Sequence, residues 1–142
     1  MQTRSLIAIV LLLLSNLCYS QENEYSAEKV ARVIDIQLAA EVGSDLRPIV
    51  PTLLFNPKNK IYVVITTTAP DTQTFGSLGV AWRFGSGDIE EAVHSEGREL
   101  VFSGDGTTLF QISKPDGWPH GEYSVEVFLN GKSVRRLRYK VQ

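Results

Sequence analysis

Apolar and polar residues alternate with a period of two in two long segments of the chain. The alternating apolar positions are Ile34, Ile36, Leu38 and Ala40 in the first segment, and Leu78, Val80, Trp82 and Phe84 in the second. This alternation predicts strands with one face in a core. A third segment, "KIYVVITTT" over 60–68, is almost entirely β-branched or aromatic, which predicts a central strand.

The segments between them predict turns and shorter strands. Residues 43–59 hold three prolines and form a long irregular connection, with "TLLF" over 52–55 as a short edge strand. Glycines at positive φ are expected in the "GSG" turn over 85–87 and in "SGDG" over 103–106. The charged segment "DIEEAVHSE" over 88–96 predicts an edge strand protected against aggregation.

The last third of the chain adds two predicted hairpins. "ELVFS" and "TTLFQIS" form the first, with Leu100 and Phe102 facing Phe110 and Ile112. "EYSVEVFLNGKSVRRLRYKV" forms the second. No segment predicts a helix convincingly. We therefore expect a single all-β domain over residues 30–142, a seven-stranded antiparallel β-sandwich.

The stretch "PHGEYSVEV" over 119–127 resembles the start of strand F in immunoglobulin-like and fibronectin type III-like domains. The resemblance implies that Tyr123 forms a tyrosine corner, its hydroxyl bonding to the preceding loop, and that Trp82 is the core tryptophan of strand C. Val125 stands where an antibody domain has a cysteine, so a disulfide-free relative is implied. The pattern also resembles small uncharacterised bacterial exported proteins.

The first residues predict export. "MQTRS", the apolar run "LIAIVLLLL" and "SNLCYS" follow the order of a signal peptide over 1–20, and the polar residues 21–29 form a flexible lead-in. A membrane anchor is the alternative, but the run is short for a hydrocarbon layer of about 30 Å. Leu17 before Cys18 departs from a lipoprotein signal. The short run and the poor lipoprotein signal indicate no stable membrane anchor. A chain without Cys18 has no disulfide, and it has no glycosylation sequon, which favours a periplasmic or secreted bacterial protein.

Composition and motifs give little sign of chemistry. The chain of 142 residues has a net charge of −2, so no nucleic-acid partner is indicated. His94 and His120 lie in different segments, and zinc sites usually combine three or four ligands, so we expect no metal and no cofactor. Neither a nucleophile elbow nor a P-loop is present. The acidic residues of the predicted edge are interpreted as solvated; they are Glu90, Glu91, Glu96 and Glu99.

Two functions remain open, and a hydrolase is a distant third. One is a non-catalytic protein-binding or adaptor module of the bacterial envelope, whose partner has an acidic surface. The other is a glycan- or peptidoglycan-binding module that uses Trp118, Phe75 or Phe128 as stacking platforms. Trp118 is alternatively a plug over one end of the sandwich, because tryptophan stabilises most when its large surface is buried.

In the last hairpin, the turn that the sequence favours would place arginines on the buried face. A two-residue Asn130-Gly131 turn puts Arg136 opposite Val125 and Arg138 opposite Tyr123, in the core. Burying two arginines without partners is costly. We therefore expect a three-residue loop with a bulge at Gly131, so that Tyr123 faces Leu137. The expected result is an outer basic row of Arg136, Arg138 and Lys140, with Arg83 beside it and Phe128 as an apolar centre. Such a row is either a binding site or an ordinary solvated face.

Overall fold

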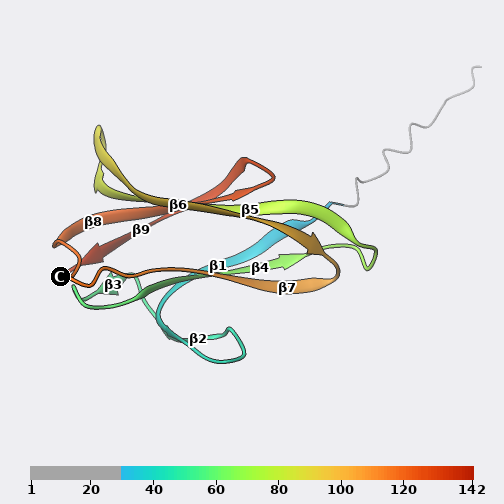
Figure 1. The fold of residues 1–142 in the computed structure, drawn as a ribbon, viewed down its shortest axis with the longest axis horizontal. Coiled ribbons are helices and arrows are strands. Elements are labelled where there is room, and N and C mark those ends of the chain that lie inside the picture. Colours follow the sequence, from blue (N-terminus) through green and yellow to red (C-terminus); the bar gives the residue numbers. More distant parts are fainter. Residues whose placement is uncertain (1–29) are drawn as a thin grey trace, which may run out of the picture.

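The computed structural model describes residues 30–142, which form two stacked β-sheets (Figure 1). The strands are β1 (Arg32–Val42), β2 (Pro48–Pro51), β3 (Leu54–Phe55), β4 (Ile61–Thr68), β5 (Thr74–Ser86), β6 (Ile89–Phe102), β7 (Asp105–Ile112), β8 (Gly121–Leu129) and β9 (Lys132–Val141). One sheet has the order β2-β1-β4-β7 and the other β3-β9-β8-β5-β6. The predicted signal peptide (1–20) and lead-in (21–29) lie outside the described residues.

The all-β class is confirmed, with two differences in detail. The described residues form nine strands rather than seven, because residues 48–55 supply two short strands. The second of them, β3, pairs with β9 in parallel, whereas every pairing was expected to be antiparallel. The predicted edge strand at "TLLF" and the central strand β4 are both confirmed.

The core lies between the inner faces of the two sheets. Its largest fully buried side chains include Trp82, Tyr123, Phe55 and Phe110. Leu78 and Val80 join them, as the alternation over 78–84 predicted, and Val125 and Val127 of β8 do so as well. Ile34 does not, and more than half of its surface is exposed. A bulge at Ile34, between the pairs Val33–Thr67 and Asp35–Thr66, reverses the direction of its side chain.

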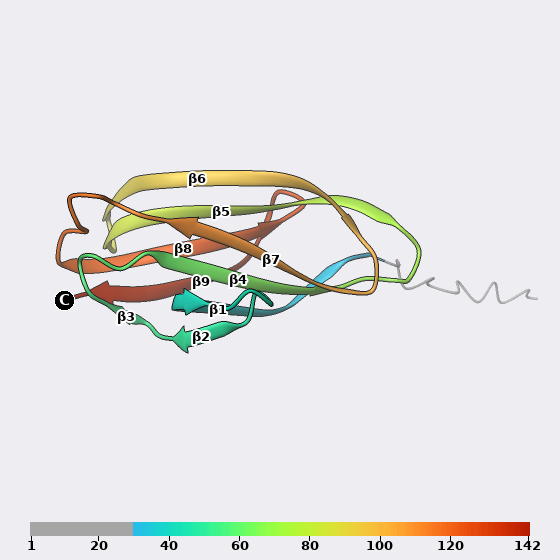
Figure 2. The same ribbon diagram turned by 60° about the horizontal axis from the view of Figure 1, so that its bottom comes forward.

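The hairpin predicted over 99–113 is wrong. Residues 89–102 form one strand of 14 residues, and β7 pairs with β4 of the other sheet. The chain crosses between the layers at Ser103 and Gly104, beside the β4–β5 link (Figure 2). Gly104 has a φ of 61° and bonds the main chain of Ala69 and Pro70. Phe102 and Phe110 share the core whether their strands form a hairpin or belong to opposite sheets. The apolar pattern therefore does not distinguish these two arrangements.

Strand β6 is the predicted edge strand, and it directs charged residues toward the sandwich interior. His94, Glu96 and Arg98 lie opposite Trp82, Val80 and Leu78, whose side chains are in the core. The Arg98 guanidinium lies 4.2 Å from the centre of the Phe110 ring and donates to the Leu109 carbonyl oxygen at 2.8 Å. These groups cover the open edge between the sheets and hinder pairing with another strand.

The β8–β9 hairpin keeps the arginines out of the core by a bulge within β9 and not by the expected three-residue loop. Asn130 and Gly131 have φ values of 52° and 77° and form a two-residue turn, with Leu129 opposite Lys132. The extra residue lies within β9, where Val134 bulges between Ser133 and Arg135. The predicted partners are therefore wrong by two positions, since Tyr123 faces Tyr139 rather than Leu137. The predicted faces are correct.

Candidate binding groove

The outer face of the five-stranded sheet carries most of the residues predicted as a binding site. Arg136 and Arg138 pair with Glu126 and Ser124 and point away from the core, which holds Val125 and Tyr139. Lys140, Arg83 and Phe128 follow the same alternation and share this outer face. Trp118 does not belong to this group.

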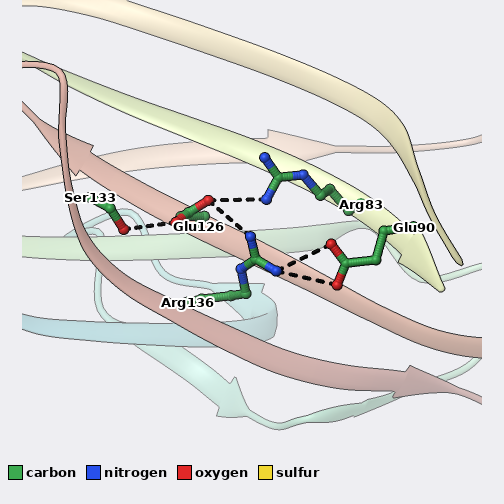
Figure 3. Close-up of polar contacts among 5 residues, drawn as sticks. All are labelled: Arg83, Glu90, Glu126, Ser133 and Arg136. Atoms are coloured by element: carbon green, nitrogen blue, oxygen red, sulfur yellow. Dashed lines mark hydrogen bonds and ion pairs between the residues drawn. The ribbon is translucent and has the colours of Figure 1, made fainter. Parts of the chain in front are cut away.

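Carboxylates neutralise part of the basic row (Figure 3). Glu126 accepts hydrogen bonds from Ser133 at 2.7 Å, from Arg83 at 3.0 Å and from Arg136 at 3.2 Å. Arg136 also donates to both oxygens of Glu90 at 3.2 Å. The Ser133 hydrogen bond and the two guanidinium groups lower the pKa of the Glu126 carboxyl. This part of the row is a closed ionic network rather than a free basic surface.

A groove of about 460 Å³ lies beside the network. It is at the end of the sheet where both the C-terminus and the β5–β6 turn lie (Figure 1). It crosses the outer face from β3, over β9 and β8, to the start of β6. Its lining residues are Thr52, Leu53, Leu54, Gly85, Ser86, Glu90, Glu122, Tyr123, Ser124, Arg138, Tyr139 and Lys140. Volumes of roughly 300–1,000 Å³ are typical of ligand sites.

Ser124 and Arg138 are polar side chains of this groove that form no hydrogen bond with the rest of residues 30–142. Ser124 is 3% exposed, and its hydroxyl has no hydrogen-bond partner among the described residues. Arg138, its neighbour across β8 and β9, makes neither a hydrogen bond nor an ion pair within residues 30–142. Lys140 is only loosely paired, with its Nζ atom 3.7 Å from Glu122. A buried hydroxyl without a partner costs free energy, so it marks a place where a ligand can form a bond.

An apolar wall closes the side of the groove next to β3. Leu53 and Leu54 are each more than half exposed. Main-chain bonding fixes this wall, because the Lys140 amide donates to the Leu53 carbonyl oxygen at 3.0 Å. The exposed Ile49 and Val50 of β2 precede the wall along the chain. Sequence reasoning missed this wall. The apolar run "PIVPTLL" without alternation was the available signal.

Trp118 is the predicted plug and not a surface platform. It is 7% exposed and packs edge-on against Tyr123, with the ring centres 6.2 Å apart. Its indole donates to the Asn59 carbonyl oxygen at 3.1 Å, and its amide donates to that of Pro57 at 2.8 Å. The plug joins the loop before β8 to the loop before β4.

The candidate catalytic side chains lie apart. His94 is on β6 and faces Glu96 at 3.8 Å, whereas His120 lies exposed in the loop before β8. Glu90 bonds Arg136 and Glu96 bonds Arg98, so these acids are structural partners. Residues 30–142 contain no cluster of three potential metal ligands, and they form no helix long and apolar enough to cross a membrane.

Comparisons with known proteins are informative about the fold. No family model matches the chain, and no curated protein matches its sequence. A β-glucosidase from Erythrobacter marinus matches with a TM-score of 0.54 and 10% identity, over 80% of this chain and 15% of the enzyme. The DNA-bound alkylpurine DNA glycosylase AlkC from Pseudomonas fluorescens matches with a TM-score of 0.53 and 8% identity, over 79% of this chain and 30% of that protein. This chain thus corresponds to less than a third of either, and the likeness at such identity is one of fold alone.

Proposed function

We propose that this protein is a non-catalytic binding module of the bacterial envelope that contacts a partner protein through the outer face of its five-stranded sheet. The groove carries the proposal, because it combines an exposed aliphatic wall with a buried hydroxyl that has no partner in residues 30–142. Contiguous exposed apolar surface beside polar groups is typical of interaction sites. The compartment follows from the leader-like sequence of residues 1–20.

We further propose that the sandwich is immunoglobulin-like. The supporting observation is the Tyr123 hydroxyl, which donates to the Pro119 carbonyl oxygen four residues upstream at 2.7 Å. This is the hydrogen bond of a tyrosine corner. Domains of this kind host many unrelated functions, so the groove, and not the fold, supports the binding role.

A protein partner is favoured over a glycan by the positions of the aromatic rings. A stacking site needs exposed rings, but Trp118 is buried and Phe128 is partly buried. Phe75 is exposed, and it lies on β5 far along the strand from the groove. The groove itself contains Tyr123 and Tyr139, whose rings stack in the core.

Affinity capture from the native cells tests this function when it is combined with a pair of matched variants. Leu53→Asp places one negative charge on the groove wall. Ile34→Asp places the same charge on an equally exposed apolar residue of the other sheet. We expect the wall variant to lose the protein partner and the control to retain it, with unchanged circular dichroism for both. Equal capture by both variants, or capture of glycan alone, would contradict the proposal.

A further inference from the structure

The outer face has one guanidinium that the fold does not use. Arg83 and Arg136 bond Glu126, and Arg136 also bonds Glu90. Arg138 has no such partner within residues 30–142, although it lies on the same strand and the same face as Arg136. Of the two acids of the groove, Glu90 bonds Arg136, and Glu122 pairs loosely with Lys140 at 3.7 Å. The groove therefore presents one uncompensated cation.

The unused hydroxyl lies directly beside this cation. Ser124 and Arg138 are opposite one another in the β8–β9 pairing, and both point outward. Opposed residues of an antiparallel pair have Cβ atoms about 4.5–5.5 Å apart. A hydroxyl and a guanidinium at this separation are both hydrogen-bond donors to a single carboxylate, and arginine binds carboxylates through two parallel hydrogen bonds.

The apolar wall of Leu53 and Leu54 lies across β9 from Ser124. Leu54 is opposite Lys140 in β3–β9, so it shares the outer face with Arg138. A group that reaches Ser124 and Arg138 across β9 thus passes Leu53 and Leu54. An extended peptide has the required composition, with a carboxylate at one position and aliphatic side chains next to it.

We infer that the groove binds a carboxylate carried by an extended segment of the partner protein, with Arg138 and Ser124 holding the carboxylate and Leu53 and Leu54 contacting the neighbouring apolar side chains. The inference rests on the proposed function and specifies its ligand. The carboxylate is either an Asp or Glu side chain or a chain terminus.

Selection from a phage-displayed library of random peptides on the purified exported protein tests the inference. We expect enriched peptides to share an acidic residue beside aliphatic ones. Arg138→Gln should weaken a synthetic selected peptide about tenfold or more, since charge-assisted hydrogen bonds are lost. Arg135→Gln is the matched control, an exposed arginine of the same strand outside the groove, and it should leave the affinity unchanged. In the selected peptide, replacing the acidic residue by its amide distinguishes recognition of a side-chain carboxylate from recognition of a free chain terminus.

Ser124→Ala separates binding from folding. The hydroxyl has no partner in residues 30–142, so the variant should unfold at the same urea concentration as the parent or a higher one. It should nevertheless weaken the selected peptide severalfold.

Four outcomes would overturn the inference: no enriched peptide, peptides without an acid, equal loss in the two arginine variants, or binding of a glycan alone. Its failure is distinguishable from that of the proposed function. If the wall variant loses the partner but Arg138→Gln retains it, the proposed function holds and the carboxylate inference is wrong. Absence of any protein partner removes both.

Discussion

Two tyrosines at the centre of the core differ in their hydrogen bonding. Tyr123 and Tyr139 stack with ring centres 5.3 Å apart. The Tyr123 hydroxyl donates to the Pro119 carbonyl oxygen, whereas the Tyr139 hydroxyl has no partner in the described part of the chain. Burial raises the pKa of both phenols, so both are neutral at ordinary pH. The same side chain thus has opposite effects on stability at two neighbouring positions.

Tyr123→Phe should lower the free energy of unfolding by about 1 kcal/mol, because it removes a made hydrogen bond. Tyr139→Phe should leave it unchanged or raise it, because it removes a buried hydroxyl that bonds nothing. Urea unfolding of the two variants and the parent measures the difference. Equal losses in both variants would show that the Tyr139 hydroxyl has a partner in solution.

The role of a residue was predictable from the sequence where the pattern allows only one position for its side chain. Tyr123 and Trp82 were assigned to the core correctly, because the alternation of β5 and β8 leaves no other direction for them. Ser124 was not identified, since a serine on an outer strand face gives no signal until its neighbours are placed. Leu53 and Leu54 were not identified as a wall, because a short apolar run between prolines has no period that shows which side is exposed.

At the scale of elements, the β8–β9 hairpin sets the composition of the groove. Asn130-Gly131 favours a two-residue turn, and the alternation of β9 favours arginines outside. A two-residue turn and outward arginines are compatible only if β9 contains one more residue than β8 across the pairing. The structure places this extra residue at Val134. The sequence therefore determined the faces but left the position of the bulge open. A bulge in the loop and a bulge in the strand satisfy the same parity and shift the pairing by two residues.

Deletion of Val134 should be tolerated. Without it, Arg135 follows Ser133 directly, the pairs from Val127–Arg135 onward are kept, and every side chain stays on its present face. Deletion of Leu137 is the control. It moves Arg138 toward the core and should remove most of the ~5–15 kcal/mol typical of a domain. Thermal unfolding compares them. Similar losses for the two deletions would place the bulge elsewhere.

At the scale of the whole molecule, the two sheets pack face to face. Their inner faces close a single core, and the charged residues of β6 cover its edge. The all-β class was predictable from alternation, but the assignment of strands to sheets was not. Leu100 and Phe102 of β6 and Phe110 and Ile112 of β7 reach the same core from opposite layers, which their pattern alone does not reveal.

Site-specific photocrosslinking tests the central claim, contact of a partner protein with the groove, most directly. The only cysteine of the sequence is Cys18, in the predicted signal peptide, so one substitution gives the exported protein a unique thiol. Ser86→Cys places it on the exposed rim of the groove, and Ile34→Cys places it on the other sheet. After labelling with a benzophenone maleimide and irradiation in native extract, we expect a protein adduct from the Ser86→Cys variant and none from the Ile34→Cys variant. Adducts of equal yield from both positions, or from the Ile34→Cys variant alone, would contradict the account.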